Sequence, residues 1–456
     1  CRRTLSVPTS GVPDYYPMGG ASYGTEFTRE DINSALASDD SFSLVPSKDA
    51  NGHGTYLAGL AAGRSFPLQN FTGAAPMSDL AIVKLKPAKK YLRDYYLIPE
   101  KADAFQENDI MMGIKYLRVL ADRFRQPLVI LLGLGSNYGS HTGSSPLSQV
   151  AQNYGGFFGI ATVIAAGNET GLAHHYAGRL SADTSYEDVE LRVGKKEAER
   201  GFILELWSSA TELYTVGFVS PGGERINRIP ILANNETRIP FLLENTTVTV
   251  NYELIEAGSG SQLVSMRFEK PSAGIWTIRV YNTQFLTGDY HMWLPVQGFI
   301  SDETVFLKPD PSNTITVPGN SRLPITVGAY DHRNNSIYIH SSRGYISRDS
   351  VKPDLAAPGV DVLGPANTSV HSDILKNTQT FTHRTGTSAA AAITAGAVAN
   401  LLNWGIVMGN YPTMSEASIK SYLIRGASRN PSLSYPNREF GYGTLDLLQT
   451  FLKLRE

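Results

Sequence analysis

The stretch DANGHGTYLAGLAAG, residues 49 to 63, sets a histidine between two glycines and follows it with a run of small residues. Gly52 and Gly54 keep the space on both sides of the His53 imidazole free of side chains. The small-residue run predicts a helix that packs closely against a sheet. A lone histidine is more often structural than catalytic. This one is predicted at the amino end of a helix with room for a substrate, so His53 is a candidate functional residue.

Two other polar residues stand at comparable places. Ser388, in RTGTSAAAAITAG (384 to 396), opens a second small-residue helix, where a serine is by default a helix cap. Capping does not account for the glycine before the threonine and serine, and backbone N–H groups at a helix start favour a developing negative charge. Asn168 follows the apolar run VIAAG and is by default a turn residue. Its alternative role is that of an amide donor aimed at an oxyanion.

The segments around these residues have an α/β pattern. Apolar runs at 79 to 86, 127 to 135 and 159 to 169 predict buried strands, and NDIMMGIKYLRVLADRF (108 to 124) predicts an amphipathic helix. Similar runs return at 320 to 331 and 352 to 362, before the small-residue helix at 386 to 405. Strands that alternate with helices at this spacing predict a parallel sheet flanked by helices.

The middle of the chain has a different pattern. Residues 189 to 305 hold short runs with period-two alternation, such as GFILELW and TTVTVNYELI, separated by turn residues. About eight strands at this spacing predict a jelly-roll-like β-sandwich, with Trp207, Trp276 and Trp293 largely buried. We therefore expect residues 1–188 and 306–456 to form one α/β domain that carries the sandwich, 189–305, as an insertion.

Composition excludes several functions. Forty basic residues against 42 acidic ones leave no charge excess that would direct the chain to nucleic acid, and no run of 18 apolar residues predicts a membrane span. With Cys1 as the one cysteine, a multi-cysteine metal site is excluded. The adjacent His174 and His175 would point to opposite faces of a strand, without a cluster of other ligands. No metal and no cofactor is predicted.

The motifs NGHGT, AAGN and GTSAAAA, in this order, resemble the subtilisin family (S8) of serine peptidases, as do FTGAAPMSDLAIVKLK (71 to 86) and KPDLAAPG (352 to 359). The resemblance implies a subtilisin-like fold in which His53 is the general base, Ser388 the nucleophile and Asn168 the oxyanion donor. It also implies that an extended substrate pairs with one strand, formed here by Gly133, Leu134 and Gly135. The partner would be a protein or peptide substrate.

Two departures narrow the resemblance. The serine helix has Ala392 where the family usually has a proline, and Gly133 stands where the substrate strand usually has a serine. With SYGTEFTREDINSAL (22 to 36) and the β-rich insert, these features look like the clostridial germination proteases, the Csp group. That resemblance implies a spore or secreted location, processing of the chain's own pro-segment, and activation of a precursor such as a spore cortex hydrolase. Some members of the group are pseudoproteases that act in germinant signalling.

The acid of a subtilisin triad is not identifiable in this chain. In this family it lies in a D-T-G or D-S-G context at the end of the first core strand, and neither tripeptide occurs. Asp49 belongs to the histidine motif and is expected to shape its turn. We expect the acid's strand to lie just ahead of Cys1. The alternative is a pseudoenzyme, and the intact His53 and Ser388 favour the first interpretation.

Overall fold

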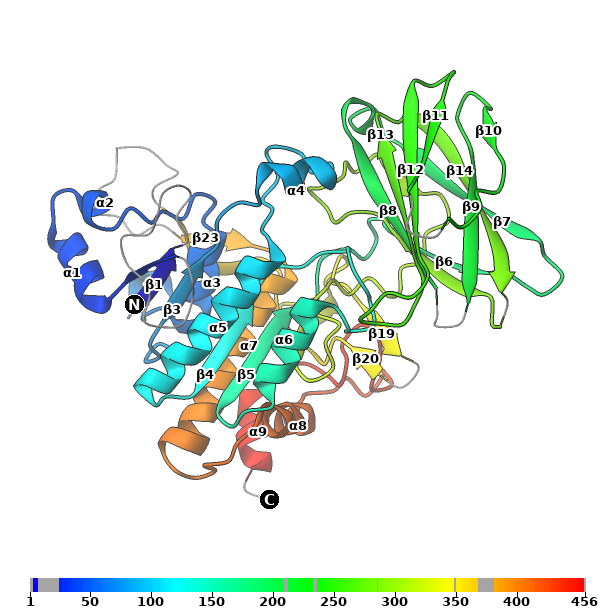
Figure 1. Cartoon of the computed structure of the whole chain (residues 1–456). Coiled ribbons are helices and arrows are strands. Elements are labelled where there is room, and N and C mark those ends of the chain that lie inside the picture. Colours follow the sequence, from blue (N-terminus) through cyan, green and yellow to red (C-terminus); the bar gives the residue numbers. More distant parts are fainter. Residues whose placement is uncertain are drawn as a thin grey trace.

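The computed structural model describes the backbone of residues 3–6, and residues 24–208, 212–232, 236–284, 286–347, 350–367 and 381–454. Figure 1 shows an α/β body that contains both ends of the chain and, beside it, a β-sandwich built from the middle of the chain. The predicted fold class, a parallel sheet flanked by helices with an inserted β-sandwich, is confirmed.

The central sheet of the α/β body has the order β18-β17-β5-β4, with β21 paired to β17. Its strands β4 (Leu128–Leu132), β5 (Ile160–Ala165), β17 (Ile325–Asp331) and β21 (Leu355–Pro358) are parallel, and β18 (Ser336–Ile337) is antiparallel. Every residue of β5 is buried. Alternate residues of β5 enter different hydrophobic clusters on the two faces, which explains the continuous apolar run.

Helices cover both faces of this sheet. In Figure 1, α5 (Glu107–Phe124) and α6 (Pro146–Gly155) lie in front of β4 and β5. The opposite face holds α7 (Thr387–Leu402), which packs against α3 (His53–Ala62). The other helical segments of this body are α1 (Arg29–Ala37), α2 (Ser41–Leu44), η1 (Pro67–Gln69), α4 (Lys90–Tyr95), η4 (Asn403–Val407), α8 (Glu416–Gly426) and α9 (Leu447–Lys453), and η2 (Glu197–Glu199) follows β7 (Tyr186–Val193).

Small residues bring α3 and α7 together and into the core. A Cβ on Gly396 would lie 2.6 Å from the carbonyl oxygen of Ala61, so only glycine allows this approach. Thr387–Val407 is the one helical stretch in the described ranges that is long and apolar enough to cross a membrane. It is mostly buried inside the α/β body, as the core helix of a soluble protein is.

A second, smaller sheet has the order β2-β1-β3. Strand β1 (Arg3–Ser6) pairs in parallel with β3 (Ala81–Lys84) and antiparallel with β2 (Thr25–Phe27). Helix α5 packs on this sheet as well, because Gly113 lies against Val83. Both β3 and β4 stand at the end of their sheets. Within the described ranges, each therefore has a strand partner on one side only.

The sandwich consists of two antiparallel sheets with the orders β10-β9-β14-β7-β16 and β11-β12-β13-β8-β15-β6. The first sheet contains β7 (Tyr186–Val193), β9 (Leu213–Val219), β10 (Arg225–Ile226), β14 (Gly274–Gln284) and β16 (Val305–Phe306). The second contains β6 (His175–Arg179), β8 (Gly201–Ser208), β11 (Thr237–Phe241), β12 (Thr246–Glu253), β13 (Leu263–Glu269) and β15 (Asp289–Trp293). These strands number more than the eight or so expected, because β10 and β16 are only two residues long and β6 lies upstream of residue 189.

The sandwich core is aromatic and aliphatic. Trp276 is fully buried between the two sheets, where it contacts Phe241 and Phe268 edge to face. Trp207 and Trp293 are buried as well, so the prediction for the three tryptophans is confirmed. The sheets include β6 and the start of β7, which precede residue 189. The domain limits 1–188, 189–305 and 306–456 stay a prediction.

The loop after β4 joins the two bodies. Asn137 donates a hydrogen bond to the carbonyl oxygen of Leu294 at 3.0 Å, and the Gly139 N–H donates to the Glu205 carboxylate at 3.0 Å. The His141 ring stacks on Trp293 with ring centroids 3.7 Å apart. Buried polar bonds and ring stacking therefore hold the sandwich against the α/β body.

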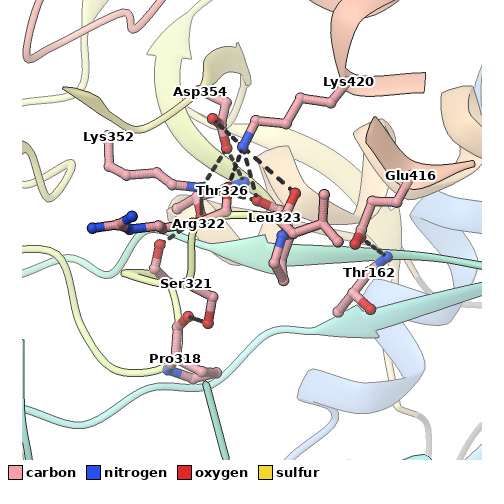
Figure 2. Close-up of polar contacts among 12 residues, drawn as sticks. Thr162, Pro318, Ser321, Arg322, Leu323, Thr326, Lys352, Asp354, Glu416 and Lys420 are labelled. Atoms are coloured by element: carbon pink, nitrogen blue, oxygen red, sulfur yellow. Dashed lines mark hydrogen bonds and ion pairs between the residues drawn. The ribbon is translucent and has the colours of Figure 1, made fainter. Parts of the chain in front are cut away.

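An ion cluster is buried in the α/β body, where α8 meets the sheet (Figure 2). The Asp354 carboxylate accepts from Lys352 Nζ at 2.6 Å and from the Thr326 N–H at 2.8 Å, and it forms an ion pair with Lys420 at 2.6 Å. Burial lowers the pKa of the Lys352 ammonium, against the opposing effect of Asp354. One carboxylate thus separates two ammonium groups. The remaining short strands are β19 (Gly344–Ser347), β20 (Ser350–Lys352), β22 (Val362–Pro365) and β23 (Phe381–Arg384).

Candidate active site

His53 is the first residue of α3. Gly52 before it has a φ of +76°, a left-handed conformation that glycine adopts without strain. The Asp49 carboxylate accepts from the Gly52 N–H at 2.9 Å, the Thr55 N–H at 2.8 Å and the Thr55 hydroxyl at 2.7 Å. Asp49 therefore shapes the turn into the helix, as expected from its place in the motif.

The pKa of the His53 imidazole is lowered from its ordinary value, which favours the neutral ring. Burial lowers its pKa, the Arg384 guanidinium lowers it further, and Asp49 and Asp103 oppose these effects from a distance. No residue in the described part of the chain forms a hydrogen bond with the ring. A neutral imidazole accepts a proton readily, which a general base requires.

Ser388 lies in the first turn of α7, two residues after the helix cap Gly386. Its hydroxyl donates to the carbonyl oxygen of Gly133 at 3.1 Å. Among the described residues nothing accepts from the Ser388 N–H, as expected for the first turn of a helix. A Cβ on Gly133 would lie 3.5 Å from Cε1 of His53 and 3.6 Å from Cβ of Ser388, so both side chains approach the same point.

Asn168 follows β5, and its amide is oriented by α7. Oδ1 accepts from the Thr387 N–H at 3.0 Å and from the Thr387 hydroxyl at 3.2 Å. The NH₂ group is therefore the end of the amide that remains as a donor. Gly386 leaves room for it, since a Cβ there would lie 3.4 Å from Asn168 Nδ2. The amide of Asn168 and the N–H of Ser388 are two donors at the same helix start.

Gly133, Leu134 and Gly135 continue the chain from the carboxyl end of β4. Gly133 allows Leu57 to come close, because a Cβ on this glycine would lie 2.4 Å from Leu57 Cδ1. A serine at this position would require the end of the Leu57 side chain to shift. Two backbone bonds between Ser136 and Val317 end the segment. Within the described ranges no backbone N–H of residues 133–135 has a partner, so this edge is available to an extended peptide.

These elements surround a pocket of about 170 Å³. Its lining includes five of the six predicted residues, all except His53. The complete lining is Gly133, Leu134, Gly135, Ala165, Gly167, Asn168, Glu169, Val296, Gln297, Thr316, Thr387 and Ser388. His53 is not part of the lining and approaches Gly133 from outside the pocket. The structure thus brings all six predicted residues to one place, while their roles stay predictions.

Sequence reasoning missed part of this pocket. Glu169 directly follows Asn168, so its place in the sequence could have identified it as a residue of the pocket lining. Val296 and Gln297 belong to the segment between β15 and β16 of the sandwich, and nothing in their local sequence indicates that they reach the α/β body. Thr316 lies after the sandwich, and a Cβ on Gly135 would lie 2.2 Å from its hydroxyl oxygen.

Comparison with known proteins identifies the class. The sequence model of the subtilase family matches residues 302–443. The structure of the Clostridium perfringens CspB protease is similar with a TM-score of 0.83 and 31% identity, over 95% of this chain and 86% of that one. Serine protease AprX of Bacillus subtilis is 33% identical over 129 residues, and the match spans 26% of this chain and 28% of AprX. The chain belongs to the subtilase family of serine proteases. Within that family it is CspB-like.

Proposed function

We propose that this chain is the catalytic part of a serine endopeptidase in which Ser388 is the nucleophile, His53 the general base and Asn168 the oxyanion donor. One observation carries the proposal: Ser388 and Asn168 line one pocket at the start of α7, and the imidazole of His53 approaches Gly133 in the lining of the same pocket. Gly133, Leu134 and Gly135 would hold the substrate backbone in extended form.

The reaction follows from this geometry. The Ser388 hydroxyl turns from the Gly133 carbonyl toward His53 and passes its proton to the imidazole as its oxygen bonds to the scissile carbonyl carbon. The carbonyl oxygen becomes an oxyanion held by the two donors at the start of α7. The imidazolium then protonates the leaving amine as the C–N bond breaks. Water hydrolyses the ester left on Ser388 by the same route.

The acid that orients the imidazole is part of the proposal. Parallel strands end at the same edge of a sheet, and within the described ranges β3 and β4 each have a strand partner on one side only. A strand upstream of Cys1 that pairs between them would carry an aspartate to the edge where His53 lies. The sequence of the encoding gene tests this. Codons for the tripeptide D-T-G or D-S-G just ahead of Cys1 support the triad, and a substituted acid there supports the alternative.

The alternative is a Csp-like pseudoprotease that acts as a binding or signalling scaffold in spore germination. Two observations favour it. The Ser388 hydroxyl donates to a backbone carbonyl and not to His53. Within the described ranges, no carboxylate forms a hydrogen bond with the imidazole, although Asp49 and Asp103 act on it from a distance. For the enzyme, the resemblance to the Csp group supports a protein precursor as substrate, such as a spore cortex hydrolase, with autoprocessing of the pro-segment.

A fluorophosphonate probe separates the two functions, because it reacts with a serine that a base activates. We expect the complete protein to be labelled and Ser388→Ala to lose the label. Ser415 is a matched control, since it also stands at a helix start, where it caps α8. Ser415→Ala should be labelled like the wild type. Equal labelling of the wild type and Ser388→Ala would refute the proposed nucleophile.

A further inference from the structure

Three histidines and a tryptophan meet where the sandwich contacts the α/β body. His175 of β6 and His291 of β15 belong to the sandwich, and His141 belongs to the loop after β4. Their ring centroids lie 4.9, 5.4 and 3.7 Å from that of Trp293, in that order. His175 and Trp293 are buried, and the other two rings are half-buried. The contact between the two bodies thus contains three titratable rings around one indole.

The hydrogen bonds of this cluster suit neutral rings. His175 Nδ1 lies 3.0 Å from the carbonyl oxygen of Asp310, which can only accept, so Nδ1 carries the hydrogen. Nε2 of the same ring then accepts from His291 Nδ1 at 3.0 Å. His141 Nε2 donates to the carbonyl oxygen of Asn137 at 3.1 Å. A proton on each of His175 and His291 would make both facing nitrogen atoms donors and break the bond between them.

Burial and like charge both disfavour protonation of these rings. Burial lowers the pKa of all three, to about 4 for His141, and a charge on His291 lowers the pKa of the other two further. A ring that leaves the contact regains its ordinary pKa of about 6.5. The separated form therefore binds these protons more tightly than the closed form, and separation is favoured as pH falls below 6.5.

Glu205 opposes this effect and determines the pH at which it begins. It lies on β8 opposite Trp293 and accepts from the Gly139 N–H at 3.0 Å, so it belongs to the same contact. Burial raises the pKa of its carboxyl to about 7. Its proton therefore favours the closed form as pH falls from 7 to 4.5, and offsets about one histidine. Three histidines against one glutamate leave the contact nearly unchanged down to about pH 6 and weaken it below that pH.

Other charged groups around the cluster are paired or act from a distance. They are Glu169, paired with His174 at 2.8 Å, Asp289, paired with Arg179 at 2.6 Å, and Asp310, which together with Asp289 raises the pKa of His291 against the effect of burial. Within the described ranges, none of these carboxylates forms a hydrogen bond with a ring of the cluster. The charge of added protons would therefore be poorly compensated.

We propose that the contact of the loop after β4 with Trp293 is a pH-sensitive switch, closed near neutral pH and released when His141, His175 and His291 take up protons. The sandwich has a hydrophobic core of its own, and Trp293 lies outside it. The contact can therefore open while both bodies stay folded. The switch does not depend on the proposed function, because none of these four residues lines the pocket beside Ser388.

Hydrogen exchange between pH 7.5 and pH 5 tests the switch, with each rate divided by the intrinsic rate at that pH. Peptides that cover residues 136–145 and the end of β15 report on the contact, and peptides that cover β12 report on the sandwich core. We expect the contact peptides to lose protection by at least about tenfold, because each released histidine favours separation by about 30-fold at pH 5 and Glu205 offsets one of the three. Protection of β12 should not change. An equal loss in β12 would mean global unfolding and would overturn the proposal.

Variants assign the response to these side chains. His141→Gln combined with His291→Asn keeps donors at the positions of His141 Nε2 and His291 Nδ1 and removes two titrating rings, so it should abolish the pH response. Each single variant should reduce the response, which keeps the test valid if the double variant does not fold. The matched control is His332→Gln, which changes an exposed histidine of the α/β body and should behave like the wild type.

Glu205→Gln should have the opposite effect. Without the offset, the loss of protection should begin about half a pH unit higher than in the wild type. The switch is refuted if protection of the wild-type contact does not change with pH. It is also refuted if the histidine variants respond to pH like the His332→Gln control.

Discussion

Asp354→Asn tests the buried ion cluster (Figure 2). The substitution keeps the size of the side chain and removes the negative charge between the ammonium groups of Lys352 and Lys420, both 2.6 Å from the carboxylate. Breaking a buried ion pair by removing one partner typically costs about 3 to 5 kcal/mol. The Lys420 side chain is 16% exposed and can turn toward water, whereas Lys352 is 1% exposed and cannot. We therefore expect a loss of about 3 kcal/mol, a large share of the roughly 5 to 15 kcal/mol of a typical protein.

Hydrogen exchange as a function of urea measures this loss where it occurs, in peptides that cover β17 and α8. The control is Asp361→Asn. This aspartate also forms an ion pair, in its case with Arg333 at 2.8 Å, but its side chain is 49% exposed. It should cost less than about 1 kcal/mol. Adding Lys420→Met to Asp354→Asn should recover part of the stability, because one of the facing cations is gone. If Asp354→Asn costs no more than the control, the cluster does not stabilise the α/β body as we argue.

Three other predictions concern pH and catalysis. Burial raises the pKa of Glu416 to about 8 from its ordinary 4.5, so the folded form holds a proton that the unfolded chain releases, and stability should fall as pH rises from 4.5 to 8. Glu416→Gln should flatten that slope in unfolding measured at pH 5, 7 and 9. Burial lowers the pKa of His141 to about 4, so only the unfolded chain takes up this proton below pH 6.5. His141 alone should therefore cost about 2 kcal/mol between pH 7 and pH 5, opposite in sign to the contribution of Glu416. The difference between the wild type and His141→Gln measures it, and the same pH dependence of stability in both proteins would contradict the prediction. If the enzyme reading holds, Asn168→Ala should lower kcat by about 10² to 10³-fold with little change in KM, and His53→Ala by about 10⁶-fold. Equal steady-state rates in both variants and the wild type would favour the scaffold.

Local sequence was sufficient for the elements that carry the site. The run IATVIA is almost entirely apolar because both faces of β5 are covered. Period-two alternation marked sandwich strands such as β12 because only one of its faces is buried, whereas β8 is buried along its whole length. The residues His53, Ser388 and Asn168 were recognisable because glycines and small residues around a functional group leave a pattern within a few positions. Strand β6 was not assigned to the sandwich, since HYAGR has no such pattern and pairs with β15 more than a hundred residues later.

Contacts between distant segments could not be read from the chain. The bond from the Gln297 N–H to Glu169 joins residues 128 positions apart, and the Glu416 carboxylate accepts from the Thr162 N–H across 254 positions. A side chain's neighbours depend on how sheets and helices pack, and many sequences satisfy the same packing. The motifs and the chemistry that they predict could be recognised in the sequence, because they are local. The partners of the Glu169 carboxylate and the direction of the Ser388 hydroxyl were decided by packing, because each depends on groups that the chain brings together only when it folds.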